Sequence, residues 1–137
     1  VDYLVTHGVG NFLWDAIETS SLFRSFRAPT EQDPLCFMST KSSLCNQVDC
    51  AGISAFLKVI YSSQYGSIAP ALHLRSVNPH IDVWQEPIML MTECLETPFR
   101  SSYGGAMNSA FGGTNIFILG WGTLDSEKRP PPPPLGH

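Results

Sequence analysis

Two hydrogen-bond donors stand five residues apart in a turn that opens a helix. Lys41 and Asn46 belong to the polar stretch of residues 41–50, which leads into a proline-free segment. The first turn of a helix presents unpaired backbone N–H groups, which usually meet an anion or a polar side chain. Lysine and asparagine add donors at this place, but the two do not form an acid–base pair. The pattern therefore predicts a donor site without general acid–base chemistry.

A histidine follows the first β-rich segment of the chain. Residues 1–6 favour a strand, and His7 comes directly after them, in a loop that contains Gly8 and Gly10. A histidine just past a strand end is a common catalytic placement, because the loop is exposed while the sheet fixes it. Such a histidine alone is more often a plain polar loop residue. His7 is therefore a candidate that needs support from other residues.

The four cysteines have neither CxxC pairing nor the spacing of metal ligands. They are Cys36, Cys45, Cys50 and Cys94. This arrangement favours free, partly buried thiols over a disulfide framework, and so a reducing compartment such as the cytosol or an organelle interior. We expect no metal site and no cofactor.

Periodic apolar residues predict two helices that position these side chains. The first covers residues 15–26 and directs four side chains inward, namely Ile17, Leu22, Phe23 and Phe26. The second covers about residues 48–63, and its apolar face consists of Ile53, Phe56, Leu57 and Ile60. Small residues between 51 and 55 let another element approach this helix closely. Gly66 is expected to end it.

Short apolar runs predict the strands. Residues 1–6, 35–39 and 88–91 read as strands, and residues 114–119 read as a strand that is buried on both faces. Residues 68–70 and 72–74 are expected to run extended, and residues 104–115 are rich in glycine. Strand, helix, strand, helix and then several strands is an α/β pattern.

Composition limits the class of protein. The 137 residues are 43% hydrophobic and 15% charged, which describes a globular chain with a real core. The net charge of −4 and the scattered basic residues argue against binding to nucleic acid. No apolar run approaches the ~18–20 residues that span a bilayer, and the start shows no signal-peptide pattern. A proline run at residues 130–134 cannot join a core.

Four ordered motifs together resemble one family. Residues 1–18, VDYLVTHGVGNFLWDAIE, are similar to the family pattern VDYVEAHGTGTPLGDPIE. Residues 41–52, KSSLCNQVDCAG, resemble KSNIGHTEAASG. Residues 72–82 are similar to LHLxxPNPHID, and residues 110–115 are similar to GFGGTN. The family is that of the β-ketoacyl synthases, and the part is the C-terminal half of the ketosynthase domain of modular or type I polyketide synthases.

The resemblance implies a fold and a division of the chain. Residues 1–122 are expected to form half of a thiolase-like α/β fold, a mixed sheet with helices packed on it. Residues 123–137 are expected to form an extended, proline-rich tail.

The resemblance also assigns roles to three positions. The family uses a cysteine nucleophile and two histidines that bind the malonyl carboxylate and stabilise the enolate, and a lysine supports the second histidine. His7 occupies the first histidine position and Lys41 the lysine position. The second histidine position holds Asn46, which cannot carry a proton or a positive charge.

Other positions depart from the family pattern in ways that weaken the site. The loop threonines have become Val9 and Asn11, Trp14 replaces a glycine, and Cys45 replaces the glycine before the second histidine. The family's nucleophile lies in the N-terminal half of a ketosynthase, and none of the four cysteines carries its motif. We therefore expect His7, Lys41 and Asn46 to be remnant positions, and these residues alone not to perform the condensation.

The favoured function is that of a structural or accessory module of a larger protein assembly. Half of a layered fold would expose apolar faces, which other subunits would cover, and attachment to a membrane assembly would be peripheral. The interaction candidates are large aromatic residues that could cover such faces, together with the proline run, namely Phe12, Trp14, Trp84, Trp121, Pro130, Pro131, Pro132, Pro133 and Pro134. Two alternatives remain open. The chain could be a fragment or split subunit of an active condensing enzyme, or it could bind a small molecule in a remnant acyl pocket gated by Trp14.

Overall fold

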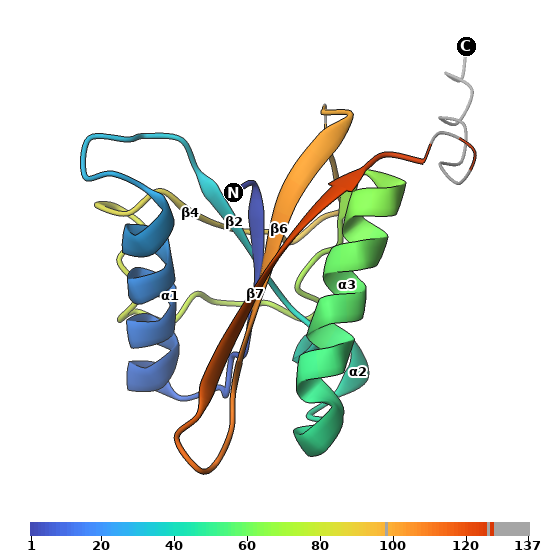
Figure 1. The fold of residues 1–137 in the computed structure, drawn as a ribbon. Coiled ribbons are helices and arrows are strands. Elements are labelled where there is room, and N and C mark those ends of the chain that lie inside the picture. Colours follow the sequence, from blue (N-terminus) through green and yellow to red (C-terminus); the bar gives the residue numbers. More distant parts are fainter. Residues whose placement is uncertain (98, 126, 128–137) are drawn as a thin grey trace.

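A five-stranded sheet is the middle layer of the computed structural model, which describes residues 1–97, 99–125 and 127 (Figure 1). The strands follow the order β4-β2-β1-β6-β7. Their bounds are Ile88–Leu90 for β4, Leu35–Ser39 for β2, Tyr3–Thr6 for β1, Ser101–Ser109 for β6 and Asn115–Thr123 for β7. The first four strands are parallel, and β7 runs antiparallel to β6. The expected mixed sheet is therefore confirmed.

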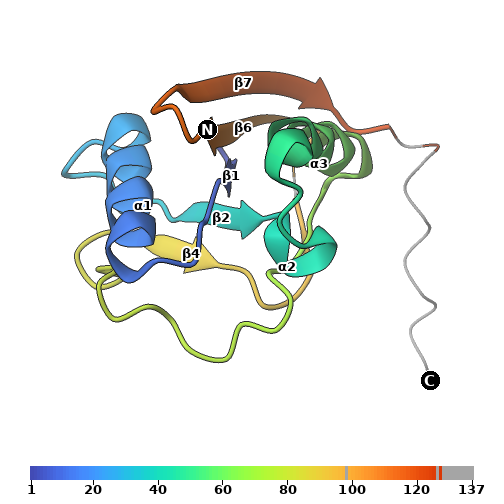
Figure 2. The same ribbon diagram turned by 90° about the horizontal axis from the view of Figure 1, so that it is seen from below.

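Two long helices cover the two faces of the sheet. Helix α1 (Phe12–Phe26) lies on one side and α3 (Ala51–Tyr65) on the other, as Figures 1 and 2 show. Between β2 and α3 come a short helix, α2 (Lys41–Leu44), and a 3₁₀ turn, Val48–Cys50. A small second sheet pairs β3 (Ser67–Ile68) with β5 (Leu95–Glu96). The three-layer arrangement brings the ends of β1 and β2 close to the starts of both helices.

The alternation of side chains along β1 divides the core into two halves. Tyr3 and Val5 belong to the cluster on the α3 side, whereas Leu4 belongs to the cluster on the α1 side. All three side chains are fully buried. A strand that is buried at every position in this way is typical of a central parallel strand, since helices cover both of its faces.

Helix α1 begins earlier than predicted and exposes one of the four residues expected inside. Leu22 and Phe23 are buried and Phe26 is partly buried, but the side chain of Ile17 is 65% exposed. Ile17 precedes Leu22 by five residues, which at 3.6 residues per turn places it on the far side of the helix. The inward assignment of Ile17 was wrong for this reason.

Helix α3 buries the opposite face from the one predicted. Its buried residues are small or branched at Cβ, namely Ala51, Ala55, Val59, Ser62 and Ser63. The large apolar residues Ile53 and Leu57 are 62% and 45% exposed. Close approach to the sheet explains this choice, because a Cβ atom at Gly122 of β7 would lie only 2.5 Å from the Cβ of Ser63. A helix that lies this close to a strand can bury only small side chains there.

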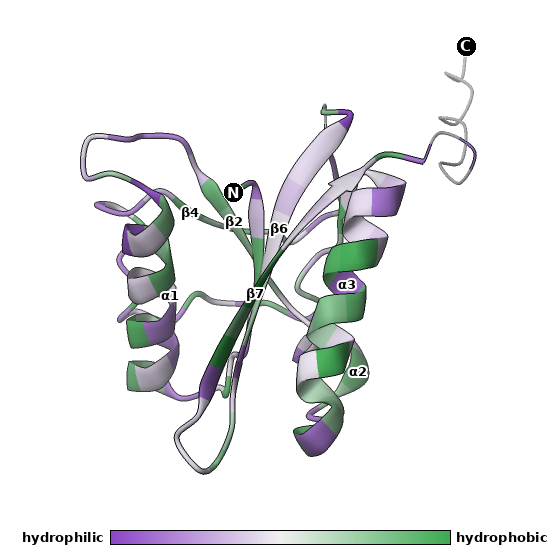
Figure 3. Ribbon diagram, in the orientation of Figure 1, coloured by the Kyte–Doolittle hydropathy of each residue, from purple (hydrophilic) through white to green (hydrophobic). Residues whose placement is uncertain are grey.

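The last strand was predicted to be buried on both faces, and it is not. Strand β7 is at the edge of the sheet, and four of its apolar residues are 38–56% exposed, namely Ile116, Phe117, Ile118 and Leu119. Figure 3 shows the apolar colour along this part of β7 and along α3. Residues 104–115 were described only as rich in glycine, and no strand was predicted there. Strand β6 nevertheless includes residues 104–109, and its glycines make room for neighbouring side chains.

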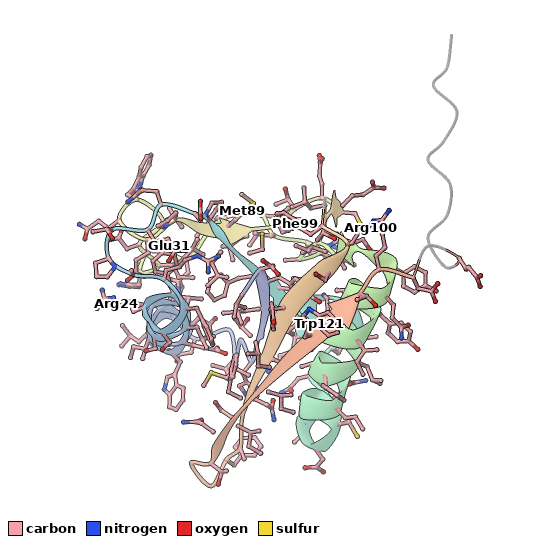
Figure 4. All side chains as sticks on the ribbon, turned by 45° about the horizontal axis from the view of Figure 1, so that its top comes forward. Arg24, Glu31, Met89, Phe99, Arg100 and Trp121 are labelled. Carbon is pink, nitrogen blue, oxygen red and sulfur yellow. The ribbon has the colours of Figure 1, made fainter. Side chains whose placement is uncertain are left out.

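An ion pair anchors the segment before β4 to α1. Arg24, labelled in Figure 4, donates from Nε to a carboxylate oxygen of Glu86 at 2.6 Å, and Ser20 donates to the same oxygen at 2.9 Å. The Glu86 side chain is almost fully buried. This contact positions residues 78–87 against the first helix.

Several other expectations have clear outcomes. Gly66 ends α3 in the left-handed conformation, as predicted. Residues 72–74 form no strand, and His73 has a positive φ of 63°. The proline run lies outside the described residues, as does most of the predicted tail. No helix within the described ranges is long and apolar enough to cross a membrane.

Candidate functional site

The loop after β1 is held by carboxylates from the first turns of α1. The backbone N–H groups of His7 and Gly8 donate to the two carboxylate oxygens of Glu18, at 2.6 and 3.0 Å. The N–H of Gly10 donates to the carboxylate of Asp15 at 3.1 Å. Gly8 and Gly10 have φ values of 53° and 79°, which only glycine adopts readily. The loop is thus built by two acidic side chains and two glycines.

Asn11 starts the helix that carries these carboxylates. Its side-chain oxygen accepts hydrogen bonds from the N–H groups of Leu13 and Trp14, at 3.0 and 3.2 Å. Asparagine is among the best residues for this capping position. Asn11, which replaces a family threonine, therefore supplies the cap of α1.

Three side chains from distant parts of the chain meet at the end of β1. His7 Nδ1 lies 2.7 Å from the side-chain oxygen of Asn108, which stands near the end of β6. Lys41 Nζ lies 3.3 Å from the same ring nitrogen, and it also donates to the backbone oxygen of His7. The structure therefore brings Lys41 to His7, the first histidine position, whereas the resemblance implied that the lysine supports the second position, which holds Asn46. Asn108 was missed, because no spacing in the sequence relates it to His7.

The surroundings of Lys41 disfavour its charge. Burial lowers the pKa of the Lys41 ammonium below its ordinary value, and the carboxylates of Glu18 and Asp15 oppose that shift. Burial also lowers the pKa of Lys58, which donates to the backbone oxygen of Ser39 at 2.9 Å. Two partly buried lysines thus stand at the ends of β1 and β2, where a negatively charged group would stabilise their charged forms.

Asn46 lies in a strained turn between α2 and the 3₁₀ turn. Its side-chain oxygen accepts from the N–H of Val48 at 3.3 Å. Cys45 has φ 61° and ψ −175°, a region that belongs almost only to glycine. Val48 has φ 42°, which is unusual for a β-branched residue. The family glycine at position 45 fits this backbone, and the cysteine that replaces it is strained.

A cavity of about 750 Å³ connects the loop, the turn and the end of β6. Its lining combines polar groups with large apolar ones, namely His7, Val9, Asn11, Trp14, Asn46, Val48, Asp49, Asn108, Ser109, Ala110, Phe111 and Gly113. His7 and Asn46 thus face the same space, and Trp14 forms part of its wall. Lys41 contacts His7 without lining the cavity. Phe111, 97% exposed, was not predicted as a site residue.

The remaining interaction candidates lie away from the cavity. Phe12 begins α1 and makes an edge-to-face contact with His80, with ring centroids 6.2 Å apart. Trp84 is 95% exposed in the segment before β4. Trp121, labelled in Figure 4, projects from β7 and is also exposed. These three aromatic residues thus belong to three different segments of the chain, and none of them lines the cavity.

None of the four cysteines lines the cavity. Cys36 is buried in β2 with its sulfur 3.9 Å from that of Met89, and burial raises the pKa of its thiol. Cys45, Cys50 and Cys94 are exposed. Within the described ranges no three His, Cys, Asp or Glu residues cluster closely enough to hold a metal ion.

Comparison with known proteins assigns this chain to a family. The profile for "Beta-ketoacyl synthase, C-terminal domain" matches residues 1–75, which is more than half of the chain. This chain belongs to the β-ketoacyl synthase family. The resemblance seen in the sequence motifs is thereby confirmed, and the chain is a ketosynthase-like region of the polyketide synthase type.

Curated relatives of this ketosynthase-like chain are much longer proteins. It is 30% identical over 133 residues to polyketide synthase PksM of Bacillus subtilis, covering 87% of the chain and 3% of that protein. It is 31% identical over 137 residues to the spectinabilin polyketide synthase system protein NorC of Streptomyces orinoci, covering 98% of the chain and 6% of that protein. The chain therefore corresponds to a small part of each relative.

Solved ketosynthases share the fold of this chain. The ketosynthase from module 1 of the bacillaene synthase of Bacillus amyloliquefaciens superposes with a TM-score of 0.84 at 25% identity, over 92% of this chain and 24% of that one. An oxazolomycin ketosynthase domain of Streptomyces albus superposes with a TM-score of 0.79 at 25% identity, over 90% of this chain and 22% of that one. The thiolase-like α/β fold is confirmed, and the ketosynthase-like chain spans about a quarter of these structures.

Proposed function

We propose that this ketosynthase-like chain is a non-catalytic module that serves as a structural part of a larger protein assembly. The observation that carries the proposal is the content of the cavity. His7 and Asn46 line it, so the cavity holds an asparagine amide at the position of the family's second histidine.

The replacement of the second histidine supports the same proposal. The side chain of Asn46 is neutral, and its oxygen is engaged by the N–H of Val48. The asparagine offers one amide donor, but it cannot supply a positive charge to an oxyanion. Loss of one such donor costs about 10²–10³ in rate in comparable sites. The chain's own polar groups are therefore poorly suited to the decarboxylative step.

Exposed apolar faces support a role in assembly. Ile53, Leu57 and Tyr61 recur every four residues along the outer face of α3, and all three are exposed. The apolar residues of β7 add a second exposed area at the edge of the sheet. Single chains seldom leave contiguous apolar surface of this kind in water, since covering it is favourable by ~25 cal/mol per Å². We propose other protein subunits as the partners.

One observation favours a second candidate function. His7, Lys41 and Asn108 keep a close arrangement, and the fold matches solved ketosynthases with a TM-score of 0.84. The chain would then be the C-terminal part of an active β-ketoacyl synthase that performs decarboxylative Claisen condensation. The nucleophilic cysteine would come from a segment outside this sequence or from another chain.

Gentle isolation of the native protein, with mass spectrometry of the intact assembly, distinguishes the two candidates. The isolated assembly is then assayed for decarboxylation of a malonyl thioester and for condensation with an acyl thioester. We expect partner subunits and no condensation, from both the parent chain and the Asn46→His variant. Recovery of a ketosynthase half with its cysteine, together with condensation that His7→Ala abolishes, would establish the enzyme instead.

A further inference from the structure

Two polar groups lie next to Nδ1 of the His7 ring, and they require different protonation states of that nitrogen. The side-chain oxygen of Asn108 lies 2.7 Å from Nδ1, and Lys41 Nζ lies 3.3 Å from the same atom. An oxygen requires a proton on Nδ1, whereas an ammonium group requires a lone pair there. A neutral imidazole carries its proton on one nitrogen only. The two contacts therefore favour different tautomers.

Distances and alternative partners decide between these contacts. A separation of 2.7 Å is at the short end of N–H···O hydrogen bonds, while 3.3 Å is longer than their usual range. Lys41 has another acceptor, because it donates to the backbone oxygen of His7. If Asn108 instead turned its NH₂ group to the ring, two donors would compete for one lone pair. The contact with the Asn108 oxygen is therefore the one that the ring satisfies.

The carboxamide of Asn108 is itself held in place from two sides. Its backbone belongs to β6, opposite Ile116 of β7 in the antiparallel register. Its side chain packs against Gly52 of α3, where an added Cβ atom would lie 3.3 Å from Nδ2 and 3.5 Å from Cγ. The absence of a side chain at position 52 thus leaves the space that the Asn108 carboxamide occupies.

We propose that Asn108 is a positioning residue that fixes the tautomer of His7, with the proton on Nδ1 and the lone pair on Nε2. The contacts of the described residues leave Nε2 as the ring nitrogen available to the cavity that His7 lines. A neutral His7 then accepts a hydrogen bond from a ligand amide N–H or hydroxyl group, and does not donate one to a carbonyl oxygen. This assignment holds whether or not the chain is catalytic, so it goes beyond the proposed function.

The tautomer is measured directly by long-range ¹H–¹⁵N correlation spectra of the complete chain, labelled in histidine. A nitrogen that bears a proton and one that bears a lone pair resonate in separate regions. The His7→Gln variant identifies the His7 signals among those of the other histidines. With the imidazole neutral, we expect the proton on Nδ1. A proton found mainly on Nε2 of His7 overturns the proposal.

Three variants and one control separate positioning from a merely structural effect. Asn108→Ala removes the acceptor and should shift the tautomer ratio about five- to tenfold toward the Nε2–H form, the equivalent of one hydrogen bond. Asn108→Asp keeps an acceptor oxygen and should retain the proton on Nδ1. Gly52→Ala crowds the carboxamide, whose Nδ2 would lie 3.3 Å from the added Cβ atom, and should shift the tautomer ratio in the same direction as Asn108→Ala but by less.

Ser109→Ala is the matched control, because Ser109 follows Asn108 in β6 and lines the same cavity. It should leave the tautomer unchanged. If Asn108→Ala prevents folding, Gly52→Ala and Asn108→Asp still give opposite expected results. An unchanged tautomer in Gly52→Ala and Asn108→Ala, or a lost Nδ1 proton in Asn108→Asp, would refute the assignment.

Discussion

The backbone N–H of His7 donates to the carboxylate of Glu18 at 2.6 Å. The second oxygen of the same carboxylate accepts from the N–H of Gly8 at 3.0 Å. One side chain of α1 therefore satisfies both peptide groups that follow β1, where the chain leaves the sheet. This contact fixes the position of the imidazole relative to Lys41 and to the cavity.

Replacement of Glu18 by alanine should destabilise the fold and loosen this loop. Two partly buried N–H groups would lose their acceptors, which corresponds to about 1–3 kcal/mol. Urea unfolding followed by circular dichroism measures the loss. Asp15→Ala serves as the comparison, because the hydrogen bond that it removes, from the N–H of Gly10, is exposed, and its effect should stay below about 1 kcal/mol. Equal effects of both substitutions would contradict the role given to Glu18.

Replacement of Gly104 by alanine should be strongly unfavourable. A Cβ atom at this position would lie 2.4 Å from Cε2 of Tyr3. The Tyr3 ring is fully buried, and its hydroxyl group is hydrogen-bonded to Ser63 at 2.6 Å and to the backbone oxygen of Val59. Because the ring cannot move aside, we expect a loss of about 1–3 kcal/mol from overpacking.

Gly120 provides a matched control for this substitution. It stands opposite Gly104 in the register of β6 and β7. A Cβ atom there would meet its nearest neighbour, Cγ1 of Val59, at 3.5 Å, which is ordinary contact. Gly120→Ala should therefore change the free energy of unfolding much less than Gly104→Ala. A urea midpoint that is lower for Gly120→Ala than for Gly104→Ala would show that Tyr3 does not require a glycine at position 104.

Replacement of Cys45 by glycine should stabilise the fold. Cys45 is exposed, so little packing is lost, and its φ of 61° with ψ of −175° costs a non-glycine residue about 1–3 kcal/mol. The extra freedom of glycine in the unfolded chain offsets about 0.4–1 kcal/mol. A net gain of about 1 kcal/mol should raise the urea midpoint. Cys50→Gly, at a right-handed position, should lower it. A lower urea midpoint in both variants would show that the backbone at Cys45 is not strained.

The parts of the fold that the sequence predicted are those set by local pattern. The strands at residues 3–6, 35–39 and 88–90 consist of short apolar runs, and Gly66 ends the second long helix as predicted. The start of the first long helix was predicted at residue 15, three residues late, because the cap at Asn11 was not recognised. The order of the four motifs was sufficient to indicate the family. The contact between Lys41 and His7 was not among these predictions, because the resemblance relates the lysine to the second histidine position.

Tertiary contacts decided what the sequence could not predict. Helix α3 carries an apolar stripe that includes Ile53 and Leu57. The helix lies so close to Gly122 of β7, however, that it buries its small residues there instead. Strand β6 was not predicted, because its glycines, which make room for the side chains of neighbouring strands, hide the apolar pattern of a strand. Asn108 is separated from His7 by 101 positions, so only the sheet order brings them together.

Stability at alkaline pH should depend on Lys41. Burial lowers its pKa below the ordinary value of 10.5, so between the folded pKa and 10.5 the unfolded chain binds more protons than the folded one. The free energy of unfolding should therefore rise with pH in this window. Lys58 acts in the same direction, since burial lowers its pKa as well. Each lysine should contribute separately to the slope.

Lys41→Met should reduce this slope, because it removes one of the two contributions. Above pH 9.0 the buried Cys36 thiol, whose pKa is raised, opposes the two lysines equally in the parent chain and in the variants. The slopes of parent and variant are therefore compared with each other, at several pH values below 10.0, the ordinary pKa of tyrosine. Above that value the Tyr3 hydroxyl, whose pKa is raised by burial, makes stability fall again as the unfolded chain loses its proton first. Lys58→Met should reduce the slope independently, and the double variant should flatten it further. The same slope in the parent chain and in Lys41→Met would mean that Lys41 stays fully charged beside His7, and that the carboxylates of Glu18 and Asp15 offset its burial.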